Sequence, residues 1–68
     1  MKQFYLDRIV DETGISGTGV VAEGVEFSDG RCCLRWLTKF TSFCFYDNRE
    51  AVIAIHGHNG KTLVRFDE

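Results

Sequence analysis

Short runs in which apolar and polar residues alternate make up most of the chain, and segments rich in Gly, Asp and Asn separate them. Such alternation places successive side chains on opposite faces and is typical of β-strands. The strongest signal is a pair of these runs over residues 20–37, on either side of Asp29-Gly30. Because Asp-Gly favours the type I′ turn, this pattern predicts a tight β-hairpin.

A turn centred on Asp29-Gly30 also predicts the register of the hairpin. The expected cross-strand neighbours are Phe27 with Cys32, Val25 with Leu34, and Glu23 with Trp36. One face would then be apolar, consisting of Val21, Val25, Phe27, Cys32, Leu34 and Trp36. The other face would carry Glu26, Cys33 and Arg35, with Glu26 diagonal to Arg35 and able to pair with it.

Further short strands are predicted before and after the hairpin. The expected order is a strand from Phe4 to near Val10, a glycine-rich loop over 11–19, the hairpin, a polar connection over 38–42, a strand over 43–46, a turn over 58–61 and a strand over 62–66. Apolar alternation and β-branched or aromatic residues support each of these strands.

Residues 47–57 allow two interpretations. Asp47 or Asn48 as the N-cap and Gly57 at the end favour a short helical turn. The β-branched residues in this segment would also suit a strand. The capping signals favour the helical turn.

These elements predict a mainly β fold. Roughly five short strands without proline suggest a small open barrel of the SH3-like type. The alternative is a curved antiparallel sheet with one short helical turn packed on it. A chain of 68 residues has room for a single domain, residues 1–68. Because a chain this short buries only about 60% of its unfolded surface, its core is thin and a homo-oligomer stays open.

The charge of the chain argues against nucleic acid as a partner. The net charge is -2, and the eight Lys and Arg residues are scattered singly. Binding to phosphates normally requires a basic stripe. Ten carboxylates against eight cations also leave too weak a field for a mimic of DNA.

Cysteine use and the absence of an apolar segment predict a cytoplasmic protein without a membrane partner. Cys32, Cys33 and Cys44 are expected to be small hydrophobic residues in a reducing compartment. Charged residues stand too early for a signal-peptide core. No apolar run approaches the roughly 20 residues of a membrane helix.

Two glycine motifs resemble nucleotide-binding sequences but do not have the required context. Gly60-Lys61-Thr62 resembles the end of a P-loop, yet the earlier glycine is replaced by Ile55 and a strand, not a helix, is expected to follow. Residues 14–19 contain three glycines in the reverse order of a dinucleotide fingerprint, and a strand is again expected next. The first is interpreted as a turn and the second as a loop that leads into the hairpin.

The histidines and cysteines do not assemble a recognisable catalytic or metal motif. His56 and His58 would lie on one side of an extended segment, and Cys44 could join them around zinc. No second ligand cluster has a metal-site spacing, and no spacing ties a cysteine to a histidine base. The sequence therefore predicts no metal, no cofactor and no enzyme activity.

Aromatic residues are concentrated in residues 36–46, which contain five of the nine in the chain. Alternation cannot bury Phe40, Phe43, Phe45 and Tyr46 together, so some of them should form a surface patch that suits a partner. The predicted binding residues are Arg35, Trp36, His56, His58 and Lys61. Arg35 and Trp36 should project from opposite sides of one strand.

Residues 13–30 (TGISGTGVVAEGVEFSDG), Arg35-Trp36 and residues 55–62 (IHGHNGKT) together resemble a known family. It consists of short, uncharacterised proteins of bacteriophages, prophages and some archaea. The resemblance covers nearly the whole chain, but the stretch from Cys32 to Tyr46 is richer in Cys and Phe than is usual there. It implies a phage accessory protein acting in the host cytoplasm, and it implies no catalytic or ligand-binding residues.

The leading hypothesis from the sequence is therefore a non-catalytic binding module of phage or prophage origin that engages a host or viral protein. Inhibition of a host-defence component is one example of such binding. A second hypothesis is a β-barrel that binds single-stranded nucleic acid through the aromatic hairpin. A third is a protein that sequesters a small molecule or nucleotide with the glycine-rich loop and the turn from His56 to Lys61.

Overall fold

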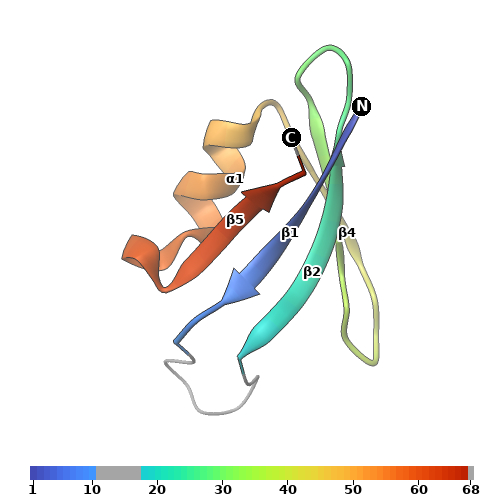
Figure 1. Cartoon of the computed structure of the whole chain (residues 1–68). Coiled ribbons are helices and arrows are strands. Elements are labelled where there is room, and N and C mark those ends of the chain that lie inside the picture. The colour runs from blue at the N-terminus through green and yellow to red at the C-terminus, as the bar shows by residue number, and fades with distance from the viewer. Residues whose placement is uncertain (11–17, 68) are drawn as a thin grey trace.

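The structure, a computed structural model, describes residues 1–10 and 18–67. The strands are β1 (Lys2–Arg8), β2 (Gly19–Glu26), β3 (Cys32–Trp36), β4 (Phe43–Tyr46) and β5 (Thr62–Phe66), and between β4 and β5 lie the helix α1 (Arg49–His56) and the 3-10 turn η1 (His58–Gly60). All neighbouring strands are antiparallel and form one sheet in the order β4-β3-β2-β1-β5 (Figure 1).

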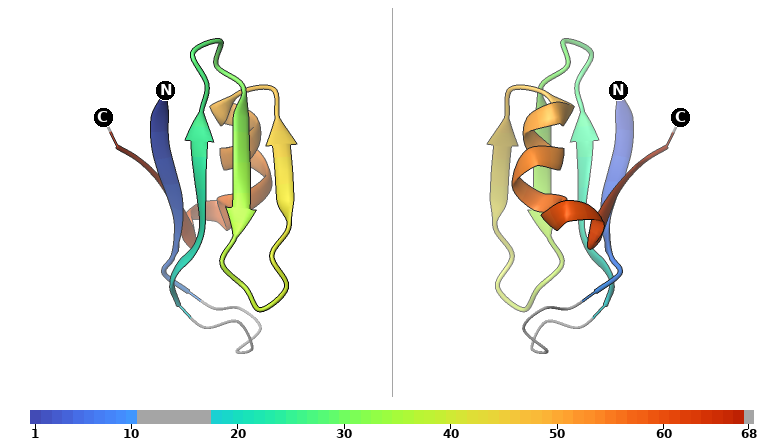
Figure 2. Two further views of the ribbon diagram at one scale, coloured as in Figure 1. Left: turned by 90° about the vertical axis from the view of Figure 1, so that its right-hand side faces the viewer. Right: turned by 90° about the vertical axis from the view of Figure 1, so that its left-hand side faces the viewer.

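The mainly β prediction is confirmed, and the curved sheet with one helix is the architecture found. The sheet stays open because β4 and β5 end the strand order and do not pair with each other. Helix α1 covers one face of the sheet and leaves the opposite face uncovered (Figure 2). Among the described residues, no helix is long and apolar enough to cross a membrane.

The core lies between α1 and the covered face of the sheet. Its fully buried members are Phe4, Leu6, Ala22, Cys32, Leu34 and Val52, and Val21, Trp36, Tyr46, Val64 and Phe66 pack around them. Trp36 is on the same side as Leu34, as the alternation predicts. Val21 reaches this side because the register of β1 against β2 shifts opposite it, between Leu6 and Asp7.

The strands of the predicted hairpin are confirmed, but its register is displaced by one residue. The Gly30 N–H donates to the Phe27 carbonyl at 2.9 Å, and the Phe27 N–H donates to the Arg31 carbonyl at 2.7 Å. Gly30 has a φ of 91°, whereas Asp29 has a negative φ. A type I turn followed by a left-handed glycine therefore replaces the expected type I′ turn.

This longer turn pairs Val25 with Cys33, and Gly24 with Leu34. The predicted placement of Val25 and Phe27 in the apolar face is therefore wrong: Val25 lies on the uncovered face, and Phe27 is 39% exposed. A one-residue slip has this effect because side chains alternate along a strand.

The predicted pair of Glu26 with Arg35 is also wrong. Glu26 lies opposite Cys32 and accepts two hydrogen bonds from Arg49, from Nε at 2.8 Å and from Nη2 at 2.9 Å. The Arg49 guanidinium lies 3.9 Å from the centre of the Phe66 ring. These contacts join the start of α1 to β2 and β5, and the Arg49 hydrogen bonds hold the pKa of Glu26 below its usual value.

The helical interpretation of residues 47–57 is confirmed. Asn48 is the N-cap, and its side-chain oxygen accepts a hydrogen bond from the Ala51 N–H at 2.9 Å. The helix ends at Gly57, whose N–H donates to the Ile53 carbonyl at 2.8 Å. The first strand ends at Arg8, before the predicted limit near Val10. The glycine-rich loop predicted over 11–19 lies mostly outside the described residues.

Candidate functional site

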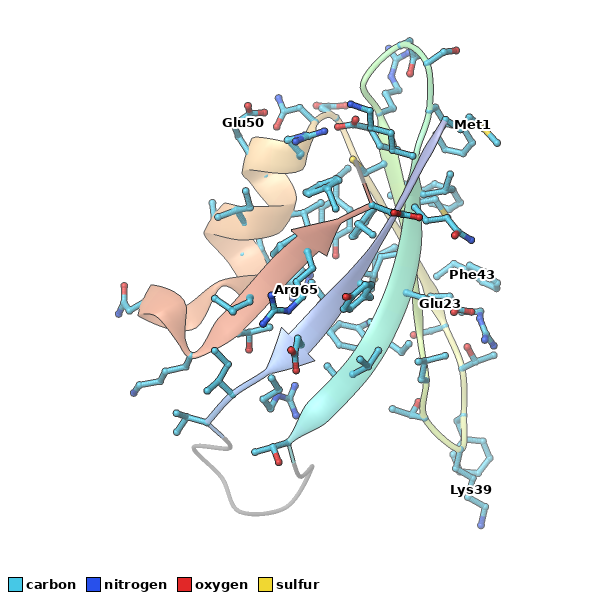
Figure 3. All side chains as sticks on the ribbon, viewed as in Figure 1. Met1, Glu23, Lys39, Phe43, Glu50 and Arg65 are labelled. Atoms are coloured by element: carbon cyan, nitrogen blue, oxygen red, sulfur yellow. The ribbon has the colours of Figure 1, made fainter. Side chains whose placement is uncertain are left out.

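The uncovered face of the sheet is the most extensive candidate surface. We call it the open face, and its side chains come alternately from four strands: Gln3, Tyr5, Glu23, Val25, Cys33, Arg35, Phe43 and Phe45. The alternate residues of these strands, such as Phe4 and Leu34, point toward α1. Figure 3 shows Phe43 and Glu23 on the side of the sheet turned away from the helix.

Aromatic side chains give the open face its character. Phe43 is 60% exposed, Phe45 is 75% exposed and Tyr5 is 38% exposed. The prediction that alternation would leave aromatic residues of 40–46 outside is confirmed, since Phe40 is exposed as well. Phe40 lies in the connection between β3 and β4 and not on the open face.

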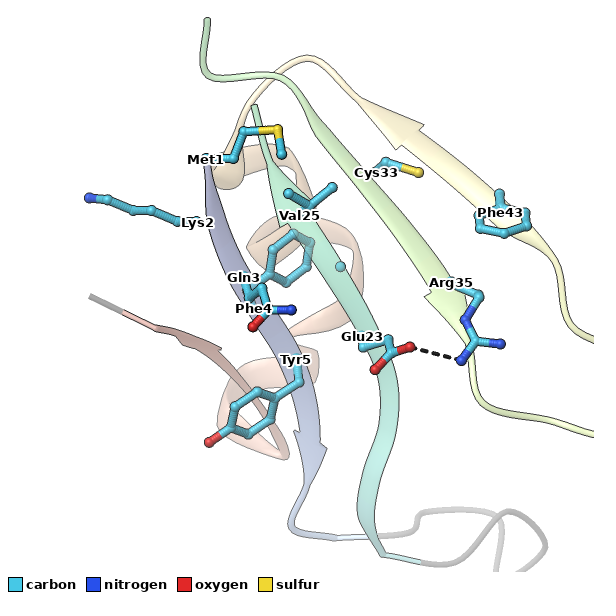
Figure 4. Close-up of a pocket in the computed structure, with 11 residues that line it drawn as sticks. Met1, Lys2, Gln3, Phe4, Tyr5, Glu23, Val25, Cys33, Arg35 and Phe43 are labelled. Carbon is cyan, nitrogen blue, oxygen red and sulfur yellow. Dashed lines mark hydrogen bonds and ion pairs between the residues drawn. The ribbon is translucent and has the colours of Figure 1, made fainter. Parts of the chain in front are cut away.

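A hollow of about 520 Å³ lies on the open face (Figure 4). Tyr5 of β1 and Phe43 of β4 lie on opposite sides of it, and Val25 of β2 lies between them. Lys2, Gln3 and Cys33 also line the hollow.

An ion pair crosses the open face beside the hollow. Arg35 Nη2 donates to Glu23 Oε1 at 2.8 Å, and both side chains are largely exposed. Because the two charges compensate each other, this part of the surface offers hydrogen-bonding groups with little net field. The hollow therefore combines apolar side chains, such as Val25 and Phe43, with polar groups such as Gln3 and this ion pair.

Among the predicted binding residues whose side chains the structure describes, Trp36 and His56 come together. Their rings meet edge to face with centroids 5.3 Å apart, and the Tyr46 hydroxyl lies 2.5 Å from His56 Nε2. This Trp36–Tyr46–His56 cluster lies where α1 packs on β3 and β4. Burial, and then a hydrogen bond with Cys44, raise the pKa of Tyr46 to about 12.

The other predicted binding residues lie elsewhere. Arg35 projects from the open face, on the side of β3 opposite Trp36, as expected. Lys61 follows the turn η1, which begins at His58, and its carbonyl accepts hydrogen bonds from the Ile9 and Val10 N–H groups at 2.8 and 3.1 Å. The predicted residues whose side chains the structure describes therefore do not line one common surface, and the side chain of His58 lies outside the described part.

The cysteines and histidines of the described part of the chain do not assemble a metal centre. Among the side chains that the structure describes, which do not include that of His58, no three of His, Cys, Asp or Glu lie close enough to hold a metal ion. All three cysteines are free thiols. Burial, and secondarily the nearby Glu26 carboxylate, raise the pKa of the Cys32 thiol, so it stays protonated and weakly nucleophilic.

Sequence reasoning missed Tyr5 and Val25 as residues of the open face. Tyr5 could have been found, because it stands between Phe4 and Leu6, which are both buried. Since side chains alternate along a strand, the residue between two buried ones lies on the opposite face. Val25 could not be found in this way, because the predicted turn type placed it in the core.

The fold and the open face define a class of protein: a small single-sheet domain with one face covered by a helix and one uncovered face rich in aromatic side chains. The chain belongs to the Acb5 phage protein family, whose model matches residues 1–68. The predicted relation to phage proteins is thereby confirmed, while the particular motif and the occurrence in archaea stay predictions. Searches among curated proteins and among solved structures gave no significant match.

Proposed function

We propose that this phage protein is a non-catalytic accessory module that acts by binding a host or phage protein through its open face. The observation that carries the proposal is the set of exposed aromatic side chains on a sheet face that α1 does not cover. Apolar patches of this kind are costly to leave in water and mark interaction sites in soluble proteins. Host-defence proteins are one class of partner that it would inhibit by occupying their surface, in the host cytoplasm.

The chemistry of the open face suits protein recognition. Tyr5 and Phe43, which line the hollow, are aromatic anchors of the kind that contribute about 2 kcal/mol or more each at the centre of an interface. The Glu23–Arg35 pair supplies one acceptor and several donors beside them. A partner that fits would present apolar side chains to the hollow and polar groups to this pair.

The same features favour binding over catalysis. Among the described residues that line the hollow, Glu23 is the one carboxylate, and Arg35 holds it in an ion pair at 2.8 Å. Cys33 is the one thiol among them, and neither Trp36 nor His56 belongs to this lining. The described lining thus offers surface for contact but no nucleophile with a neighbouring base.

Affinity capture with surface variants tests the proposal. The full chain is used as bait in host lysate, with and without phage infection, alongside Tyr5→Ser, Phe43→Ser and the matched control Phe40→Ser. We expect the wild type and Phe40→Ser to retain a protein that Tyr5→Ser and Phe43→Ser do not retain. Titration with the purified partner should give the same ranking of affinities. Equal capture by all four baits, or none by any, would refute the proposal.

The hollow itself supports a second candidate function, binding of a small organic ligand such as a nucleotide. Its volume of about 520 Å³ is in the range of small-molecule sites, and Tyr5, Phe43, Lys2 and Arg35 line it. The site suggested by the sequence was a different one: His56 lies in the cluster under α1 and not in the hollow. A thermal-shift screen of nucleotides should then give a rise in midpoint that Tyr5→Ser abolishes.

The remaining alternative, binding of single-stranded nucleic acid, has weaker support. The aromatic side chains could stack on bases, but Arg35 is paired with Glu23 and the chain has a net charge of -2. Fluorescence anisotropy of labelled single strands, measured at low salt with the wild type and with Phe43→Ser, tests this alternative. It requires a change in anisotropy with the wild type that Phe43→Ser does not produce.

A further inference from the structure

The outer edge of β4 has its backbone hydrogen-bonding groups directed away from the sheet. The Trp36 N–H donates to the Ser42 carbonyl at 3.1 Å, which fixes Ser42, Cys44 and Tyr46 as the residues whose backbone faces β3. Because these directions alternate in an antiparallel pair, the backbone groups of Phe43 and Phe45 point outward from the edge. Figure 2 shows β4 as the outermost strand on its side of the sheet.

From this edge we infer that two copies of the chain pair through β4, antiparallel about a two-fold axis at Cys44, and join their sheets into one continuous sheet. The inference is independent of the partner proposed above. An exposed strand edge is a template for a further strand unless charge, proline or a bulge blocks it. The β4 sequence, Phe43-Cys44-Phe45-Tyr46, contains no charge and no proline.

The other edge of the sheet does not offer the same opportunity. The Thr62 N–H, which points outward from β5, already donates to the Gly57 carbonyl at 3.1 Å. Arg65 of β5 also carries a charge, which is paired with Asp7 at 3.0 Å. The chain after α1 thus blocks part of the β5 edge, and β4 is the edge that can accept a second copy.

Within β4, a phenylalanine flanks Cys44 on each side, so a two-fold axis at Cys44 places aromatic residues opposite aromatic residues. With the axis at Cys44, Phe43 of one copy lies opposite Phe45 of the second copy, and each such pair exchanges two backbone hydrogen bonds. The phenylalanines, which are 60% and 75% exposed in the single chain, then contact one another across the joined open faces. Asp47 lies opposite Thr41 of the second copy, so no like charges meet.

The same register brings the Cys44 side chains of the two copies together on the helix side. Residues directly opposite in a non-hydrogen-bonded antiparallel pair have Cβ atoms about 4.5–5.5 Å apart, close to the separation that a disulfide requires. Cys33 is a matched control, because it is also a partly exposed thiol and lies on β3, one strand away from the edge.

Sedimentation velocity and mild oxidation of the full chain test this inference. The interface is short, so we expect a reversible dimer whose fraction rises between about 10 μM and about 1 mM. Diamide, which takes up the two thiol hydrogens, should give a covalent dimer in the wild type and in Cys33→Ser. The covalent dimer should be absent in Cys44→Ser. A sample that stays monomeric throughout, or a covalent dimer that requires Cys33, would overturn the inference.

Substitutions at Phe45 separate edge pairing from other modes of association. Phe45→Pro removes an outward N–H that the single chain does not use, and Phe45→Lys places a charge on the edge. Each should raise the dimer dissociation constant at least about tenfold while circular dichroism stays native. Phe45→Lys answers the question if the proline variant does not fold. Dimerisation that persists unchanged in a folded variant would refute pairing through β4.

Discussion

Replacing Gly24 by alanine tests the register of β2 against β3, on which both faces of the sheet depend. A Cβ at Gly24 would lie 2.4 Å from Cζ of Phe4 and 2.6 Å from the Cys33 carbonyl oxygen. Phe4 is fully buried, so its ring cannot swing into solvent to make room. In the register predicted from the Asp29-Gly30 turn, Gly24 would instead face away from the core, where a methyl group meets no ring.

The magnitude follows from two opposing effects. An added methyl group in a packed core costs about 1–3 kcal/mol through displaced rings and backbone. Removing the conformational freedom of a strand glycine recovers about 0.5–1 kcal/mol. We therefore expect Gly24→Ala to lower the free energy of unfolding by about 1–2 kcal/mol.

Urea unfolding followed by the fluorescence of Trp36, the single tryptophan, measures this change. A double-mutant cycle with Phe4→Leu identifies the cause, because a smaller side chain removes the ring contact but leaves the Cys33 carbonyl contact. We expect a coupling free energy of about 1 kcal/mol between the two positions. A Gly24→Ala protein as stable as the wild type, or strict additivity with Phe4→Leu, would refute the register and the packing described above.

Three further predictions concern the core and its titrating groups. Val52→Ala should cost about 2 kcal/mol in the same urea assay, because Val52 is fully buried, whereas Ile53→Ala, 47% exposed, should cost less than about 0.5 kcal/mol. Tyr46 has its pKa raised to about 12, so its neutral form stabilises the fold below its unfolded pKa, and this stability is lost as the pH rises from about 10 to about 12. The free energy of unfolding should fall by about 1 kcal/mol over this range, because the group is partly solvated, and the fall should be absent from Tyr46→Phe. An equal fall in the wild type and in Tyr46→Phe would contradict the prediction. The Arg49 hydrogen bonds lower the pKa of Glu26, so the ionised Glu26 stabilises the folded state above the usual carboxyl pKa, and this stabilisation disappears as the pH falls through the lowered value. In a plot of the urea midpoint against pH, Glu26→Gln should therefore show a shallower decrease at acid pH than the wild type. Equal decreases in the two proteins would rule this out.

Local signals predicted most of the elements. Asn48 and Gly57 mark the two ends of α1, because a capping side chain and a terminal glycine act within a few residues of the chain. Alternation alone located the strands from residue 43 and from residue 62. These features do not depend on distant contacts, and a single sequence was therefore sufficient for them.

The register and the site depended on information that local patterns do not contain. Asp29-Gly30 is compatible with two turns that differ by one residue, and the choice between them exchanges Val25 for Gly24 on the covered face. The structure resolves it through Phe4, a residue of another strand whose ring occupies the space beside Gly24. In the same way, Trp36 and His56 meet only because α1 folds back over β3, so their mutual contact and their distance from Arg35 were not predictable from spacing.

The two proposed interactions share Phe43 but otherwise use different residues of the open face, and Tyr5 and Phe45 make them separable by mutation. Tyr5 lies on β1, and β2 and β3 separate it from the β4 edge. Substitution of Tyr5 removes an anchor beside the hollow but no group of the edge, so Tyr5→Ser should lose the captured partner and retain the Cys44 cross-link. Phe45→Lys should retain the partner, since Phe45 does not line the hollow, and lose the cross-link. If both variants lost both properties while staying folded, self-association and partner binding would form a single surface, and the separation argued here between the hollow and the edge would be wrong.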